Sequence, residues 1–273
     1  MALAVLPIVV DRLRGAVVRN WALIAASLAA TVFLPGALGD ERIDARPANV
    51  FAAAGVGLVL CLTIPAVRTG GSGIPWGREP GDRVRLLLAA VLLFCALPWI
   101  AAGWDLSLPL PGLRSLFLTD QLRSQPGVPG VHQAVHAGFH HGWAGVMLAL
   151  TALLLSRPLP YLSRPRLRDA LALYLSFLLA YGLANAVQDF QLEQIVKRGL
   201  MTYQLPMVLA PALNWAWAVV LMAAAAIYAL GFGPLAQVAL QNSWLSSEAA
   251  TAPTVVGARQ ETPGNRVLRQ PRA

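Results

Sequence analysis

The chain has 273 residues, of which 57% are hydrophobic and only 12% are charged, with a mean hydropathy of +0.59. Soluble domains normally carry about 25% charged residues, so this composition excludes a soluble domain, a wholly disordered chain and a disulfide-stapled secreted module. The formal net charge of +8 at first suggests a nucleic-acid partner. In so apolar a chain it is better explained by the basic loops that orient membrane proteins, and we expect no nucleic acid.

Six apolar runs are each long enough to cross a bilayer as a helix, which takes about 20 residues. They lie at about 21–38, 48–67, 86–102, 131–156, 170–190 and 207–230. The sequence therefore predicts an all-α, polytopic integral membrane protein, in which residues 1–236 form a bundle of six transmembrane helices.

Basic residues are distributed unequally between the two sides that these spans define. Fifteen lie on one side and six on the other, so the positive-inside rule places the first side, and with it both termini, in the cytoplasm. We therefore expect a multi-pass protein of the inner (cytoplasmic) membrane. The fifteen are Arg12, Arg14, Arg19, Arg68, Arg78, Arg83, Arg85, Arg157, Arg164, Arg166, Arg168, Arg259, Arg266, Arg269 and Arg272; the six are Arg42, Arg46, Arg114, Arg123, Lys197 and Arg198.

The sequence also allows predictions for three segments outside the spans. The first 20 residues have no basic residue before their apolar stretch, which predicts an interfacial helix rather than a signal peptide. The loop at 103–130 is expected to cover the outer end of the fourth span. Residues 237–273 combine Ser, Thr, Gly, Pro, Gln and Arg without apolar periodicity, and we expect a disordered cytoplasmic tail.

All four histidines fall within ten residues, in the sequence VHQAVHAGFHHGW at the expected outer end of the fourth span. On a helix, His132, His136 and His140 would form one stripe because they are four residues apart, whereas His141 would point elsewhere. Imidazoles one helical turn apart can bind the same metal ion. Because ionisable groups inside a span are costly unless paired or facing a cavity, this cluster is the main candidate for function.

Polar side chains also recur every four residues along the fifth span. They are Tyr181, Asn185, Asp189 and Glu193. The fourth and fifth spans run in opposite directions, so the two stripes can face each other. The levels expected to match are Glu193 with His132, Asp189 with His136, and Asn185 with His140; Asn214 in the sixth span falls at a similar depth.

The two stripes together predict a histidine and carboxylate pocket that opens to the extracytoplasmic side. Its residue types suit a divalent metal, zinc or non-haem iron, with one position left for water or substrate. We expect His136, His140 and Asp189 to bind the metal, with His132 or Glu193 as the fourth ligand or the catalytic base. Four further residues are expected around these ligands: Tyr181, His141, Asn185 and Asn214. The predicted function is a metal-dependent membrane enzyme, a hydrolase or an oxidoreductase, acting on a lipid-like or extracytoplasmic substrate.

Other interpretations of the same residues stay open. The histidine stripe can conduct protons or metal ions in a transporter or channel, or form a hydrogen-bonded seam between helices in a non-catalytic subunit of a membrane complex. Glu193 can belong to a solvated helix end, since Lys197 and Arg198 follow it. Membrane lipid is the expected partner, and a homo-oligomer or a membrane-complex partner stays open.

Overall fold

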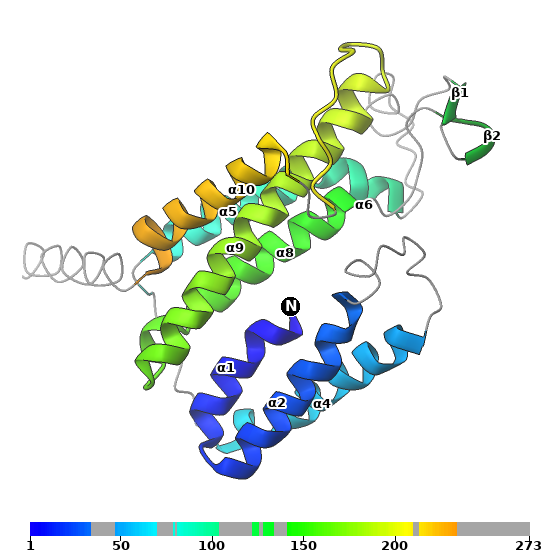
Figure 1. Cartoon of the computed structure of the whole chain (residues 1–273). Helices are drawn as coiled ribbons and strands as arrows, with labels where there is room; N and C mark the ends of the chain where they lie inside the picture. Colours follow the sequence, from blue (N-terminus) through cyan, green and yellow to red (C-terminus); the bar gives the residue numbers. More distant parts are fainter. Residues whose placement is uncertain are drawn as a thin grey trace, which may run out of the picture.

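A computed structural model describes residues 1–33, 47–69, 79, 81–103, 122–125, 128–133, 141–209 and 213–233. These residues are mostly helical, and the helices lie in two groups (Figure 1). One group contains α1 (Ala2–Leu13), α2 (Ala16–Ala30) and α4 (Pro47–Thr69). The other contains α5 (Asp82–Cys95), α6 (Leu97–Gly103), α8 (His141–Ser156), α9 (Pro165–Phe190) and α10 (Trp215–Ile227). Short elements are the 3₁₀ turns η1 (Thr31–Phe33) and η2 (Leu159–Tyr161), the π-helices η3 (Gln191–Val196) and η4 (Tyr228–Phe232), and the strands β1 (Leu122–Gln125) and β2 (Val128–Gln133).

Each of the six apolar runs contains a helix. Three helical stretches are long and apolar enough to cross a membrane: Asn49–Arg68, Pro165–Val196 and Trp215–Phe232. The apolar helices in the first and fourth runs, α2 and α8, are shorter. The third run forms α5 and α6, which meet at Ala96. Pro98 lacks the N–H that would continue the hydrogen-bond ladder at this point, which explains the break.

The fourth run departs from expectation at its start. We expected a helix from Val131, but Val128–Gln133 is the strand β2, paired antiparallel with β1. Pro129 and Gly130 are the two poorest helix-forming residue types, and Gly130 has φ of 94°, which a right-handed helix does not allow. The helical expectation is therefore wrong for residues 131–133. Most of the loop at 103–130 and the whole tail at 237–273 lie outside the described residues.

Helices α8 and α9 pack antiparallel with their backbones in close contact. A Cβ atom on Gly145 would lie 2.5 Å from the carbonyl oxygen of Gly182, and a Cβ on Gly182 would lie 2.5 Å from that of Gly145. Small residues at such a crossing allow the close approach that stabilises helix pairs in membranes. Buried side chains surround the crossing: Val146, Ala149, Ala152, Leu153, Leu171, Leu175 and Leu178.

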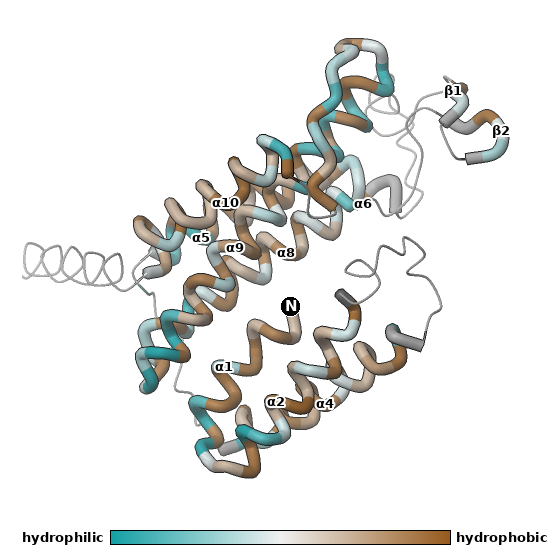
Figure 2. The backbone as a smooth tube through the Cα atoms, in the orientation of Figure 1, coloured by the Kyte–Doolittle hydropathy of each residue, from teal (hydrophilic) through white to brown (hydrophobic). Residues whose placement is uncertain are grey.

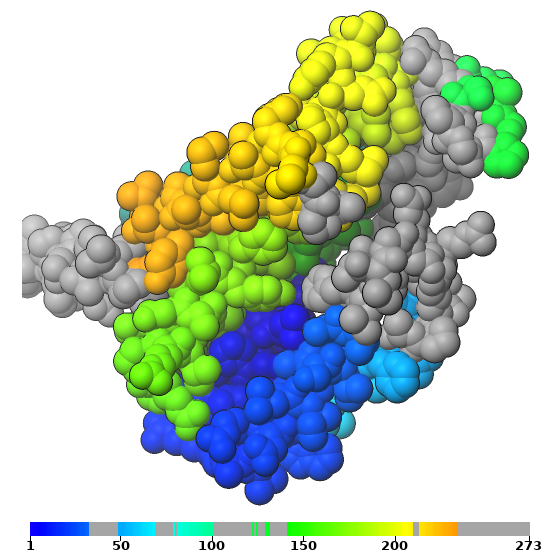
Figure 3. All heavy atoms as spheres, in the orientation of Figure 1, coloured from blue at the N-terminus to red at the C-terminus, as the bar shows by residue number. Residues whose placement is uncertain are grey.

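Helix α1 packs between the two groups and links them. Its side chains Ala4, Leu6 and Val9 are buried, and the space-filling view shows the N-terminal residues lying against α9 (Figure 3). The carboxylate of Asp11 accepts hydrogen bonds from the backbone N–H groups of Ser163 (2.9 Å) and Arg164 (3.1 Å), where α9 begins. The first residues therefore form part of the core, rather than the interfacial helix that we expected.

Three basic segments meet at one end of the bundle. Arg14, after α1, donates to the hydroxyl of Ser163 at 3.1 Å, and Arg85 of α5 donates to the hydroxyl of Ser156 at 2.9 Å. The opposite end of α9 carries Lys197 and Arg198. Hydrophilic residues gather at the two ends of α9, with mainly apolar residues between them (Figure 2). The described helices thus present an apolar belt between two polar ends.

Candidate functional site

His141, the first residue of α8, faces the C-terminal part of α9. Its Nδ1 lies 3.3 Å from Oδ1 of Asp189, and its Nε2 lies 2.5 Å from Oε1 of Gln188. Asp189 is 0% exposed, whereas the His141 side chain is 19% exposed. A buried carboxylate therefore holds one side of the imidazole ring and an amide oxygen holds the other.

The start of α8 also binds Asp189 directly. The N–H of Gly142, one of the donors that a helix leaves unpaired in its first turn, donates to Oδ2 of Asp189 at 3.1 Å. The positive end of the helix dipole favours a negative charge at this position. A Cβ atom on Gly142 would meet the Trp99 ring and lie 2.5 Å from Oδ2 of Asp189, so only glycine fits.

Trp99 of α6 closes this site on a third side. Its ring is 4% exposed and meets Phe190 edge-on, with ring centroids 6.4 Å apart. Its indole N–H is buried and has no hydrogen-bond partner among the described residues. The site is therefore built by α6, α8 and α9, and its wall includes a polar donor.

Beyond Asp189, α9 continues as the π-helix η3, which contains Glu193. Glu193 is 3% exposed, and its Oε1 lies 2.6 Å from Nζ of Lys197. The backbone N–H of Lys197 donates to the carbonyl of Leu192 five residues earlier, as a π-helix requires. Glu193 is thus a buried, ion-paired group, and the interpretation that it belongs to a solvated helix end is wrong.

Gln191 ties the segment after η3 back onto α9. Its amide nitrogen donates to the carbonyl of Tyr203 at 2.6 Å, and its amide oxygen accepts from the N–H of Leu205 at 3.3 Å. Gln191 is 7% exposed. One buried side chain thus holds the segment that contains Tyr203 and Leu205 beside the polar end of α9.

The remaining fifth- and sixth-span candidates have structural contacts of their own. Asn185 is buried and donates to the carbonyl of Tyr181 at 2.9 Å, while its Oδ1 has no hydrogen-bond partner in the described part of the chain. Tyr181 stacks on Phe177 and Trp217, with centroids 5.9 and 5.8 Å away. Asn214 caps α10, because its Oδ1 accepts from the N–H of Trp217 at 3.0 Å.

The histidines are not arranged as one helical stripe. His132 lies on β2, opposite Arg123 of β1, whereas His136 and His140 lie outside the described residues. The expectation that His141 points away is wrong, since its ring contacts Gln188 and Asp189 of the fifth span. Across the described ranges there is no group of three or more His, Cys, Asp or Glu side chains placed to hold a metal ion.

Gln188 and Gly142 are the site residues that the sequence reasoning missed. Gln188 does not belong to the four-residue repeat on which the prediction was based. Asn185, Gln188 and Asp189 are nevertheless spaced i, i+3 and i+4, so they share a helix face. Gly142 gave a weaker signal as a glycine next to a histidine. Trp99 is a third such residue, because no sequence pattern links it to the histidines.

The arrangement suits chemistry in which an oriented imidazole and a buried carboxylate act together. A carboxylate beside a histidine ring favours one orientation of that ring and stabilises its protonated form, both in metal sites and in proton transfer. No family model, no curated protein and no solved structure matches this chain. The site geometry is therefore the basis for any statement of function.

Proposed function

We propose that this protein is a metal-dependent integral membrane enzyme whose site lies at the histidine-containing end of α8 and α9. The observation that carries the proposal is the fully buried Asp189, which lies between the His141 ring and the N–H of Gly142. An ionisable group buried at this depth in an apolar bundle is costly and marks a functional site by default. The substrate we propose is lipid-like or extracytoplasmic.

The proposed topology has six spans, with both termini in the cytoplasm and the site at the extracytoplasmic side of the inner membrane. It is supported by the contacts that join the segments containing Arg14, Arg85 and Arg157 at the end opposite His141. Positive residues are retained in cytoplasmic loops, so a common basic end indicates the cytoplasmic face.

In this proposal Asp189 is a metal ligand together with His136 and His140, and His132 or Glu193 supplies the fourth ligand or the base. The contacts of Asp189 support its part, because carboxylate ligands are themselves held by hydrogen bonds from neighbouring groups. His141 and Gly142 would be those neighbours. Zinc or non-haem iron would supply Lewis acidity or redox chemistry to a bound water or substrate.

Metal content tests the proposal. Protein purified in detergent should contain about one zinc or iron per chain by elemental analysis. The variant His136→Ala/His140→Ala should lose the metal, and Asp189→Asn should weaken metal binding by about 10- to 100-fold. Asp169→Asn, the same change at a half-exposed position of α9, should retain it. Wild-type protein without stoichiometric metal would exclude a metalloenzyme.

A second candidate function is proton handling. It is favoured by the His141 ring, whose two nitrogens both face oxygen atoms, of Asp189 and Gln188. An imidazole held between two polar partners can accept a proton on one side and release it on the other. The test is proton uptake into sealed proteoliposomes. If the wild-type protein takes up protons, Asp189→Asn does not, and the purified protein contains no metal, proton handling would replace the enzyme proposal.

A further inference from the structure

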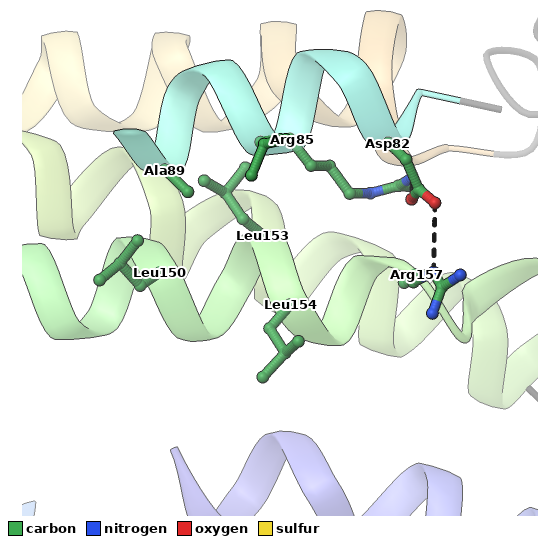
Figure 4. A pocket seen from close by; sticks show the side chains of 8 residues that line it. Asp82, Arg85, Ala89, Leu150, Leu153, Leu154 and Arg157 are labelled. Atoms are coloured by element: carbon green, nitrogen blue, oxygen red, sulfur yellow. Dashed lines mark hydrogen bonds and ion pairs between the residues drawn. The ribbon is translucent and has the colours of Figure 1, made fainter. Parts of the chain in front are cut away.

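A cavity of about 500 Å³ lies between α5 and α8, at the arginine-rich end and away from the histidine site (Figure 4). Its volume is in the range of roughly 300–1,000 Å³ that small-molecule sites occupy. Five apolar residues line it: Leu86, Ala89, Leu150, Leu153 and Leu154. The three charged lining residues are Asp82, Arg85 and Arg157.

The charged residues are linked to one another at one end of the cavity. Oδ1 of Asp82 lies 3.1 Å from a terminal nitrogen of Arg85, and Oδ2 lies 3.4 Å from Nε of Arg157. Figure 4 shows Arg85 reaching from α5 toward Asp82, and Arg157, just after the end of α8, meeting the same carboxylate. Glu79, which donates its backbone N–H to Asp82 at 2.8 Å, does not line the cavity. The lining residues themselves thus carry two positive charges and one negative charge, and the Glu79 carboxylate lies near Arg85 outside the lining.

The apolar part of the cavity reaches the outer surface of the bundle. Leu86 is 73% exposed and Leu154 is 71% exposed, one on each side of the opening. Other exposed apolar residues continue along α5, including Leu87 and Phe94. In a membrane protein this surface meets lipid tails, so the cavity is accessible to a molecule that is already in the bilayer.

We propose that this cavity binds one acyl chain of an anionic phospholipid, with the lipid phosphate at Arg157 and Arg85. The leucines and Ala89 would cover the chain, while the guanidinium groups, which suit two-point contacts with phosphate oxygens, would hold the headgroup. Basic pockets between helices on the cytoplasmic side commonly bind anionic headgroups. The site goes beyond the proposed enzyme function, because it shares no residue with the histidine site.

The test is lipid binding by the full-length protein in detergent, followed by native mass spectrometry. Phosphatidylglycerol and phosphatidylcholine with identical acyl chains are titrated separately, and inorganic phosphate is added as a competitor. Wild-type protein should prefer phosphatidylglycerol, and excess phosphate should not displace it. Arg157→Gln should weaken phosphatidylglycerol binding about tenfold, the loss expected for a charge-assisted contact. The matched control Arg83→Gln, at an exposed arginine of α5 outside the cavity, should change it by less than about twofold.

A second variant separates the lipid site from a folding defect. Ala89→Phe fills the apolar part of the cavity and leaves the Asp82, Arg85 and Arg157 cluster intact, so it should abolish phosphatidylglycerol binding in protein that still elutes as a monodisperse species. Equal binding of the two lipids, unaffected by Arg157→Gln and Ala89→Phe, would overturn the proposal. Displacement by phosphate together with normal binding in Ala89→Phe would also overturn it, and would indicate a site for free phosphate.

Discussion

The carboxylate of Asp189 has no contact with solvent, yet it meets two polar groups, the His141 ring and the Gly142 N–H. Burying a carboxylate in an apolar bundle is unfavourable unless hydrogen bonds replace its water. Here the Gly142 N–H donates to Oδ2 and the His141 ring lies within ion-pair distance of Oδ1, so the first two residues of α8 supply both contacts. The identity of residue 142 matters as much as that of residue 189, because any side chain at 142 would displace the carboxylate.

Replacing Asp189 by Asn tests this pairing directly. The amide keeps the size of the side chain but loses the charge that attracts His141, so we expect the free energy of unfolding in detergent to fall by about 1–3 kcal/mol. A double-mutant cycle with His141→Gln should give a coupling energy of about 0.5–3 kcal/mol. Titration with a denaturing detergent, followed by circular dichroism, measures both values.

The control for this change lies on the same helix. Asp169 is half exposed, and its Oδ1 is 3.7 Å from Nε of Arg168, so Asp169→Asn should alter stability by no more than about 0.5 kcal/mol. If the two variants were equally stable, Asp189 would have no special contact with α8.

Among the helices, the α8–α9 pair positions the site. The crossing at Gly145 and Gly182 lies one turn below the Gly142 contact, and it sets the distance at which His141 can reach Gln188 and Asp189. The π-helix η3 then turns Glu193 inward toward Lys197. Such π-helical insertions commonly occur at functional sites, because they redirect side chains without ending the helix.

A methyl group at the crossing should separate the two helices. In Gly182→Ala the new Cβ would lie 2.5 Å from the carbonyl oxygen of Gly145 and 2.9 Å from the N–H nitrogen of Ala149. Both are backbone atoms that cannot rotate away, so we expect a loss of about 1–3 kcal/mol in unfolding free energy, with weakened metal or proton binding. The matched control is Gly57→Ala on α4, where nothing lies within 4 Å of the new atom. It should be neutral or stabilising by up to about 1 kcal/mol, and a similar loss in both variants would count against close packing at the crossing.

For the molecule as a whole, polar ends lie on either side of an apolar belt, and the proposed topology assigns one end to each side of the membrane. Asp11 and Arg14 join α1 to the turn before α9, and Arg85 joins α5 to the end of α8. Three separate loops are thereby held at one end, and the proposed topology places all three on one side of the membrane. The segment that contains Lys197 and Gly199 lies at the other end of α9.

Cysteine labelling in intact cells tests this topology. Cys61 and Cys95, both free and exposed, are first replaced by Ser, and single cysteines are then introduced at Arg166 or Leu200, which are exposed at opposite ends of α9. A membrane-impermeant maleimide should label the Leu200→Cys variant from outside, and the Arg166→Cys variant only after lysis. The reverse pattern would place the histidine site in the cytoplasm and exclude an extracytoplasmic substrate.

Apolar composition and basic loops by themselves determined that this chain forms apolar helices suited to a membrane, because long runs without charge can satisfy their backbone groups in lipid only as helices. They also located the polar ends of the fourth and fifth runs and singled out Asp189. Tertiary structure alone decided that His141 meets it. Pro129 and Gly130 direct residues 128–133 into a strand, and the crossing at Gly145 and Gly182 brings His141 to Asp189. The place of α1 in the core also depends on a contact between Asp11 and residues about 150 positions away, and such long-range pairing leaves no local periodicity in a sequence.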